Sequence, residues 1–378
     1  MTLAVSDKAR QLKRQGVNVV SLSAGEPDFD TPEFIKQAAV EALKNGATKY
    51  TDTTGIPELK DAIREKLARD NALEYKPEQI VVSCGAKHSI YNLLQVLVEE
   101  GDEVVVQAPY WTSYPDMVTL AGATPVIVRT TEETGFRMSA RQFEAAITPR
   151  TRAFIYNSPS NPTGAVYPSE LVKELAAIAA KRGIVVISDE IYEAFTYDGA
   201  KHASFVAAHP KMRELGIVVN GMSKAYAMTG WRIGYAAGPA EIMKACNKLQ
   251  SQITSNATSV AQYAAAAALR GDPAVVRAMI AEYQKRRDHL LGRVEKVKGM
   301  RCRKPDGAFY LFVNVAGQFR DRVKGSLAWS DALLERKAVA VVPGAGFGDD
   351  AYVRMSYASS MANLNEAFDR IESFCASL

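Results

Sequence analysis

Residue types that could do chemistry follow short apolar runs in this sequence. Asp189 and Tyr192 come directly after the apolar run 184–187, and Lys224 follows a second run, 217–220. A carboxylate at the end of a buried strand is costly unless it meets a cation or a hydrogen-bond donor. A lysine beside other cations loses its proton more readily and becomes a nucleophile toward carbonyl groups. The pattern favours a reactive amine and a carboxylate that faces a ligand cation, against a solvated lysine and an ion pair with a loop arginine.

Groups that could bind anions lie at the ends of other runs. Gly85, Ala86 and Lys87 stand between a strand pattern and a helix pattern, where backbone N–H groups can approach a phosphate. Taken alone, that segment is more typical of a tight turn. Arg232 follows the lysine and suits an anion, whereas Arg354, within a strand pattern, is either a surface residue or a bidentate ligand for a carboxylate.

One cofactor accounts for the whole set. Asn161 lies in an Asn-Pro-Thr-Gly segment that is typical of a turn, but a buried amide can also donate to a ligand oxygen. Pyridoxal phosphate needs a lysine, a carboxylate at its pyridine nitrogen, donors at its ring oxygen, an anion pocket and an aromatic ring over its face. Each of these appears once, so the sequence predicts pyridoxal phosphate as the cofactor.

The elements that must position these residues alternate along the chain. Runs of consecutive apolar residues alternate with helix patterns, which is typical of an α/β fold with helices on both faces of a mostly parallel sheet. Strands are expected at 80–83, 104–107, 125–129, 153–156, 184–189, 217–220 and 233–236, and helices at 86–99, 169–181, 239–252 and 273–297. Ligands of such sheets bind beyond the carboxyl ends of the strands, which is where the polar residues lie.

The pattern changes after the long helix. Strands at 309–313, 339–342 and 352–356, with helices at 329–337 and from 362 onward, indicate a smaller α+β domain. We therefore expect a large cofactor-binding domain at 40–280 and a small domain formed by 1–39 and 281–378. The first thirty residues precede the first strong helix pattern, and no repeat or linker marks a boundary.

Composition excludes several other classes of protein. The chain has 378 residues, 47% hydrophobic and 23% charged, close to the averages for globular proteins. The net charge of +4 is small, and the basic cluster 285–287 is expected to be a solvated helix face rather than a nucleic-acid surface. Four scattered cysteines and the lack of a signal or spanning segment indicate a cytoplasmic protein. The histidines show no metal-site spacing, and the fingerprint of a nicotinamide dehydrogenase is missing.

Together these motifs closely resemble the class I aminotransferases, the aspartate aminotransferase family of fold-type I pyridoxal-phosphate enzymes. The resemblance spans nearly the whole chain. It rests on 23–29, Tyr50, 55–59, 109–111, 161–164, 189–192, 223–224, 230–234 and Arg354. The family is built as a homodimer with shared active sites, so the resemblance implies a homodimer here.

The resemblance also assigns a role to each residue. Lys224 would bind the cofactor as a Schiff base and then move a proton, Asp189 would pair with the pyridine nitrogen, and Tyr192 would contact the ring oxygen. These three are the expected catalytic residues. The cofactor would further be bound by Gly85, Ala86, Lys87, Trp111, Asn161, Arg232 and, from the partner subunit, Tyr50. The substrate would be bound by Gly25, Lys87, Trp111, Asn161 and Arg354.

The resemblance implies a ping-pong transfer of the amino group of aspartate, or of another dicarboxylic amino acid, to 2-oxoglutarate. In bacterial relatives that use aspartate, a lysine in the phosphate turn and a threonine near the N-terminus approach the distal carboxylate, and Lys87 and Thr2 match them. Open alternatives are an aromatic, alanine-type, kynurenine or prephenate/glutamate aminotransferase, and a pyridoxal-phosphate β-lyase. A cofactor-binding sensor without turnover is disfavoured by the intact lysine.

Overall fold

A seven-stranded sheet is the largest feature of the computed structural model, which describes residues 2–320 and 323–378, with side chains from residue 7 onward. Its strand order is β2-β8-β7-β6-β5-β3-β4. The strands are β2 (Ile80–Ser83), β3 (Glu103–Ala108), β4 (Thr124–Arg129), β5 (Thr151–Asn157), β6 (Val185–Asp189), β7 (Gly216–Gly221) and β8 (Gly234–Ala237). Within this sheet β8 is antiparallel to both neighbours and the other pairs are parallel, which confirms the predicted mostly parallel sheet.

Helices cover both faces of this sheet. Consecutive strand residues point to opposite faces, so that Val186 packs into one core cluster and Ile187 into the other. One face carries α2 (Glu33–Lys44), α3 (Pro57–Asn71), α6 (Ala140–Ala146), α7 (Ser169–Arg182), α8 (Met212–Leu215) and α10 (Ser259–Arg270), and the other carries α4 (Ala86–Leu97), α5 (Ser113–Leu120) and α9 (Ala240–Ile253). Burial on both faces explains why the strands are apolar at consecutive positions.

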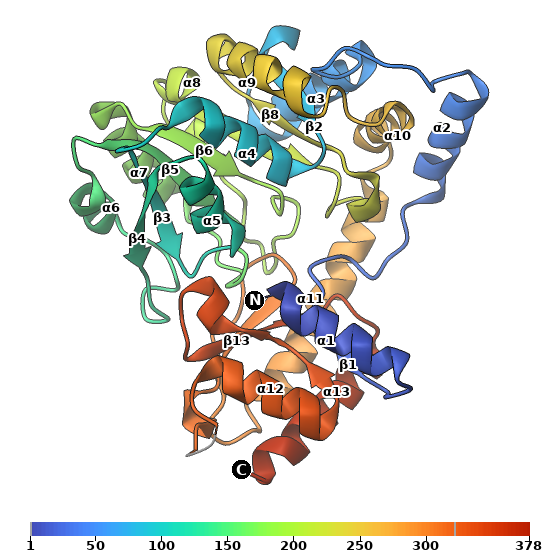
Figure 1. Ribbon diagram of the computed structural model, residues 1–378, viewed down its shortest axis with the longest axis vertical. Helices are drawn as coiled ribbons and strands as arrows, with labels where there is room; N and C mark the ends of the chain where they lie inside the picture. Colours follow the sequence, from blue (N-terminus) through green and yellow to red (C-terminus); the bar gives the residue numbers. More distant parts are fainter. Residues whose placement is uncertain (1, 321–322) are drawn as a thin grey trace.

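A smaller antiparallel sheet, in the order β12-β13-β10-β9, forms the other part of the molecule. Its strands are β9 (Arg301–Cys302), β10 (Tyr310–Asn314), β12 (Val342–Pro343) and β13 (Tyr352–Ser356), and β1 (Val20–Ser21) pairs separately with β11 (Val339–Ala340). The helices α1 (Thr2–Arg14), α12 (Gly325–Lys337) and α13 (Met361–Ala376) belong to this part. The long helix α11 (Ala274–Val294) runs between the two parts (Figure 1).

The N-terminal segment differs from the expectation. The sequence places the first strong helix after residue 30, whereas α1 is already helical from Thr2 to Arg14. Among its described side chains, Ala9 packs with Val19 and Leu334 in a small cluster. This cluster joins α1 to residues far away in the sequence, and such contacts leave no local signal.

The basic cluster at 285–287 also differs from the expected solvated face. Arg287 is fully buried, and its guanidinium binds the carboxylate of Asp198 at 2.8 Å. Arg286 is also buried and binds Asp28 at 2.9 Å. The expectation is therefore wrong for two of the three residues: besides the local acids Glu282 and Asp288, distant segments supply acids that pair with them.

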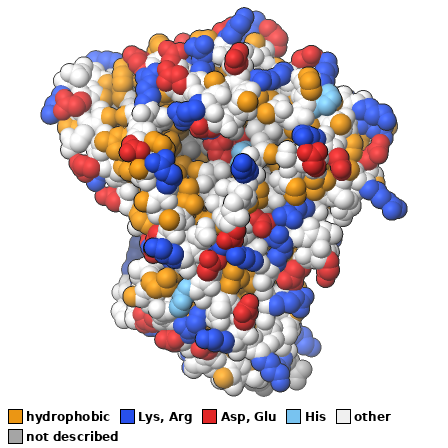
Figure 2. Space-filling view, turned by 180° about the vertical axis from the view of Figure 1, so that it is seen from behind, with side chains coloured by type: hydrophobic (Ala, Val, Ile, Leu, Met, Phe, Trp, Pro, Cys, Tyr) orange, Lys and Arg blue, Asp and Glu red, His pale blue; other side chains and the backbone are white. Residues whose placement is uncertain are grey.

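The outer surface is mixed in character. Figure 2 shows basic and acidic side chains interspersed over one face of the molecule. In the described part of the chain, no helix combines the length and apolar character needed to cross a bilayer. All four cysteines carry free thiols.

Candidate active site

A cavity of about 740 Å³ lies at the carboxyl ends of the parallel strands. Asn157 and Asp189 are the last residues of β5 and β6, Lys224 follows β7, and all three line the cavity. Because β8 runs antiparallel, its beginning lies at this same edge, and Arg232 just before it reaches the cavity. Polar residues from the ends of several strands that are far apart in the sequence thus lie together in this cavity.

The structure brings most of the predicted site residues together here. Those that line the cavity are Gly25, Ala86, Lys87, Trp111, Asn161, Asp189, Tyr192, Lys224, Arg232 and Arg354. Gly85 is just behind the lining, where a β-carbon on it would lie 2.5 Å from the Arg232 guanidinium. Tyr50 is not part of the lining and its side chain is 90% exposed. The side chain of Thr2 lies outside the described residues.

Asp189 is a buried carboxylate with hydrogen bonds but no arginine partner among the described residues. The Tyr114 hydroxyl donates to its Oδ2 at 2.6 Å, and the Ile191 N–H donates to Oδ1 at 3.2 Å. Burial raises the pKa of Asp189 to about 6, and the bond from Tyr114 opposes that rise. The alternative of an ion pair with a loop arginine is therefore wrong, and the carboxylate is free to face a cation in the cavity.

Lys224 lines the cavity, and the pKa of its amine is lowered. Its Nζ donates to the backbone oxygen of Gly25, which comes from the segment after β1. Burial, followed by the charge of Arg354, lowers the pKa of Lys224 to about 8. Near neutral pH this amine is therefore deprotonated far more often than an ordinary lysine, as a nucleophile or base requires.

Arg354 is a buried guanidinium in which one nitrogen has no hydrogen-bond partner among the described residues. It donates to Asn161 Oδ1 at 2.9 Å and to the backbone oxygen of Ser23 at 3.0 Å. Its Nε is buried and has no hydrogen-bond partner in the described structure. The guanidinium also lies over the ring of Tyr310, 4.4 Å from the centroid. An unsatisfied N–H on a buried cation that lines a cavity is suited to an anionic ligand.

The turn between β2 and α4 forms a compact cradle. Gly85 has a φ of +91°, and the Arg232 guanidinium occupies the space that its β-carbon would need. On the neighbouring strand, a β-carbon on Gly234 would lie 2.2 Å from the Ala86 nitrogen. These two glycines therefore let the first turn of α4, with its free N–H groups, sit beside a guanidinium. The arrangement suits a phosphate group.

Aromatic groups and a second amine complete the lining. The Nζ of Lys87 lies over the Trp111 ring, 4.7 Å from the centroid. The hydroxyl groups of Tyr192 and Tyr310 are 2.7 Å apart. Sequence reasoning missed Tyr114 and Tyr310: nothing in the sequence connects either of them to its partner, although Tyr114 follows Trp111 by one helical turn.

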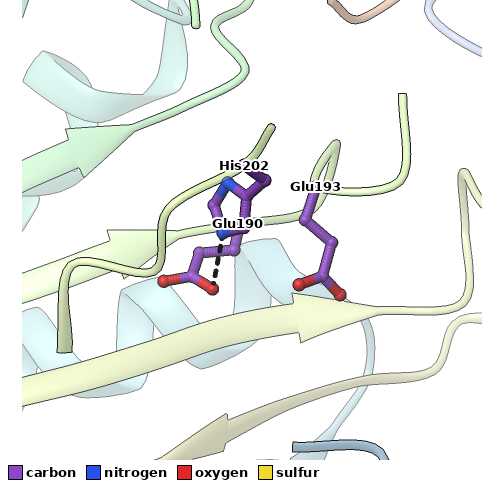
Figure 3. A group of neighbouring side chains, drawn as sticks. All are labelled: Glu190, Glu193 and His202. Atoms are coloured by element: carbon purple, nitrogen blue, oxygen red, sulfur yellow. Dashed lines mark hydrogen bonds and ion pairs between the residues drawn. The ribbon is translucent and has the colours of Figure 1, made fainter. Parts of the chain in front are cut away.

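A second group of titratable residues lies behind the strand end (Figure 3). Glu190 points to the opposite face from Asp189, where ligand atoms of Glu190, Glu193 and His202 lie within 4.8 Å of one another. Lys66 binds Glu193, and His202 donates to Glu190 at 3.0 Å. Burial opposes protonation of His202, but Glu190 outweighs it and raises its pKa. The spacing of the histidines in the sequence does not indicate this group, in which Lys66 and His202 already supply positive charge.

Comparisons with known proteins agree with this geometry. A family model described as aminotransferase class I and II matches residues 17–371. The aspartate aminotransferase of Geobacillus stearothermophilus is 47% identical, over 99% of this chain and 95% of the relative. The aspartate/prephenate aminotransferase of Cereibacter sphaeroides is also 47% identical, over 100% of this chain and 96% of the relative.

A solved structure shows the same architecture. The aspartate aminotransferase of Thermus thermophilus, determined with maleate, is 44% identical and superposes with a TM-score of 0.94 over 99% of this chain and 96% of that chain. The family match covers most of the chain, and the identities extend from end to end. The chain therefore belongs to the class I and II aminotransferase family.

Proposed function

We propose that this protein is a pyridoxal-phosphate-dependent aspartate aminotransferase that passes the amino group to 2-oxoglutarate in a ping-pong reaction. The observation that carries the proposal is the meeting of Lys224, Asp189 and Arg354 in one cavity. An amine with a lowered pKa, a buried carboxylate and a guanidinium with a free N–H are three groups that this chemistry needs at the same place.

The residues present fit pyridoxal phosphate. The buried Asp189 carboxylate lacks a cationic partner among the described residues and suits a protonated ring nitrogen. The Gly85 turn and Arg232 suit the phosphate, and Trp111 offers an aromatic face. The cofactor supplies an aldehyde and a ring that withdraws electrons from the substrate.

Each protein group then has a defined task. Arg354 binds the α-carboxylate of the substrate through its free Nε and orients Cα toward Lys224. The neutral Lys224 amine would move a proton between the substrate Cα and the aldehyde carbon of the cofactor, acting first as a general base and then as a general acid. Asp189 would hold the ring nitrogen protonated, while Tyr192 and Asn161 would donate to the ring oxygen.

A dicarboxylic substrate is favoured by the charge of the cavity. Besides Arg354, the basic side chains Lys87, Arg232, Arg10 and Lys13 line it, and Lys87 lies over the ring of Trp111. Arg354 and Lys87 can each bind one carboxylate, so together they suit a ligand with two carboxylates, such as aspartate. The relatives named for aspartate, and the neighbour determined with maleate, are consistent with this assignment.

We also propose a homodimer in which Tyr50 completes the partner's phosphate site. Tyr50 is 90% exposed, and apolar side chains are exposed on α2 nearby in sequence, among them Leu43 at 52%. Such an exposed apolar surface is typical of an interface.

The proposed domains remain 40–280, and 1–39 with 281–378. Free thiols are in keeping with the proposed cytoplasmic location.

The visible absorption spectrum of the purified protein tests the proposal. The cofactor band should change when aspartate is added without an oxo acid, and 2-oxoglutarate should restore it. A band that responds to alanine or phenylalanine but not to aspartate would reject the dicarboxylic substrate. A protein that shows no band after incubation with pyridoxal phosphate would reject the cofactor itself.

Lys87→Ala should impair aspartate selectively. Loss of a charge-assisted hydrogen bond at a partly exposed site corresponds to roughly fivefold to tenfold in kcat/KM. The reaction with alanine, which lacks the distal carboxylate, serves as the control and should change less than twofold. Equal losses for both amino acids would show that Lys87 serves the cofactor and not the substrate.

Tyr114→Phe should make the Asp189 carboxylate a weaker partner for the ring nitrogen while leaving it in place. Loss of the donated hydrogen bond raises the pKa of Asp189 and lowers the share of its charged form. We expect the half-reaction with aspartate to slow by roughly tenfold. In a plot of its rate against pH, the fall in rate on the acid side should move to higher pH. Stopped-flow absorbance across pH measures both quantities. A slower reaction without that movement on the acid side would indicate a packing defect instead.

A further inference from the structure

The Tyr192 hydroxyl group is held from across the active site. Tyr192 follows β6 of the large sheet, whereas Tyr310 opens β10 of the small sheet, and their hydroxyl oxygens are 2.7 Å apart. Both side chains are buried, with 4% and 0% of their surface exposed. This hydrogen bond therefore connects the two sheets at the cavity wall.

Tyr310 also supports the carboxylate-binding arginine. In the small sheet Phe312 pairs with Arg354, so Tyr310, two residues before Phe312, shares a face with Arg354. The guanidinium lies 4.4 Å from the centroid of the Tyr310 ring, a cation–π contact. Tyr310 thus contacts Arg354 with its ring and Tyr192 with its hydroxyl group.

The direction of this hydrogen bond decides where the Tyr192 proton points. Burial raises the pKa of both phenols, that of Tyr192 well above its ordinary value, and Arg354 opposes the rise at both, so both hydroxyl groups keep their protons. A hydroxyl group carries a single proton, so Tyr192 can donate to an oxygen of the cofactor only if it accepts its hydrogen bond from Tyr310. The Tyr192 proton is then free to point elsewhere, and the open space beside it is the cavity.

We propose that Tyr310 is a positioning residue that acts through Tyr192: its O–H donates to the Tyr192 oxygen and directs the Tyr192 proton toward the ring oxygen of the bound cofactor. The inference rests on the proposed function, because it needs pyridoxal phosphate in the cavity. The residue does not itself touch the reacting atoms. Its ring keeps Arg354 in place, and its hydroxyl group makes the Tyr192 hydroxyl group a stronger hydrogen-bond donor to the cofactor.

Tyr310→Phe separates the two contacts of this side chain. It keeps the ring under Arg354 and removes the hydroxyl group, so the KM for 2-oxoglutarate should stay within about twofold. Tyr310→Leu removes the ring as well and should raise that KM. Thermal unfolding of the cofactor-free variants shows whether either substitution disturbs the fold.

The cofactor itself reports on Tyr192. A hydrogen bond donated to the ring oxygen favours its anionic form, so a weaker donor moves the titration of the absorption band to higher pH. The titratable and charged groups that face Tyr192 are Tyr310, Arg354, Asp189 and Lys224, and Tyr310→Phe alters one of them. We expect a higher midpoint and a roughly fivefold weaker binding of pyridoxal phosphate to the cofactor-free protein, as for one neutral hydrogen bond.

A double-mutant cycle provides the decisive comparison. Tyr192→Phe should move the midpoint further than Tyr310→Phe, and the double variant should match Tyr192→Phe alone. Additive shifts, or a wild-type midpoint in Tyr310→Phe, would overturn the inference while leaving the proposed function intact. If the wild-type protein bound no pyridoxal phosphate, the proposed function would fail first.

Discussion

Replacement of Lys224 by alanine is expected to slow amino transfer by roughly 10⁴-fold or more. A positioned general base alone contributes about 10²–10⁴-fold, and the variant also lacks the amine that attaches the cofactor. Burial lowers the pKa of Lys224 to about 8, which is in keeping with both tasks. Steady-state transamination of aspartate and single-turnover absorbance measure the loss.

Two variants control the Lys224 experiment. Lys224→Arg keeps a positive charge but offers no neutral amine near neutral pH, and it should be about as inactive as alanine. Lys87→Ala removes another lysine that lines the cavity and should lose no more than about tenfold with aspartate. Turnover of Lys224→Ala close to the wild-type rate would contradict the assigned mechanism.

Replacement of Asp189 by asparagine or alanine is expected to slow the half-reaction by roughly 10²–10⁴-fold. Loss of one partner of a buried ion pair costs about 3–5 kcal/mol, and each 1.36 kcal/mol corresponds to a factor of ten in rate. Without the carboxylate the ring nitrogen stays unprotonated and the ring accepts electrons poorly. Stopped-flow measurement of the reaction with aspartate gives the rate.

Folding of the Asp189 variants can be checked without the cofactor. Burial raises the pKa of Asp189 to about 6, so the charged form destabilises the cofactor-free fold above that pH. Asp189→Asn should therefore unfold at the same or a higher temperature than the wild type above pH 6. Asp116→Asn, which changes an exposed acid at the same cavity, should alter the rate by no more than a few-fold. A normal rate in Asp189→Asn would refute the role.

The sequence predicts the large sheet well because its signals are local. The central strands are mostly apolar at consecutive positions because they are buried on both faces, and the seven expected strands all occur in the seven-stranded sheet. The polar residues that follow them, such as Asp189 and Lys224, meet in one cavity as the strand order requires. The expected strand at 339–342 is two short strands, because a change of sheet partner leaves no trace in composition.

Contacts between distant segments could not be predicted in the same way. The bond from Tyr114 to Asp189 spans 75 positions and that from Tyr192 to Tyr310 spans 118. Each tyrosine also has the pattern of an ordinary core residue. The burial of Arg287 likewise depends on Asp198, which is far away in sequence. Such pairs become visible only when the elements are placed in space.

The hydrogen bond from Arg354 to the Ser23 oxygen joins residues 331 positions apart. The seven-stranded sheet, by contrast, is contained within residues 80–237. Long-range contacts form late because the intervening chain must be ordered first. During refolding from denaturant, the secondary structure of the large sheet should therefore return before the carboxylate clamp. A population of collapsed molecules should then exist that gives a native-like far-ultraviolet signal yet does not recognise substrate.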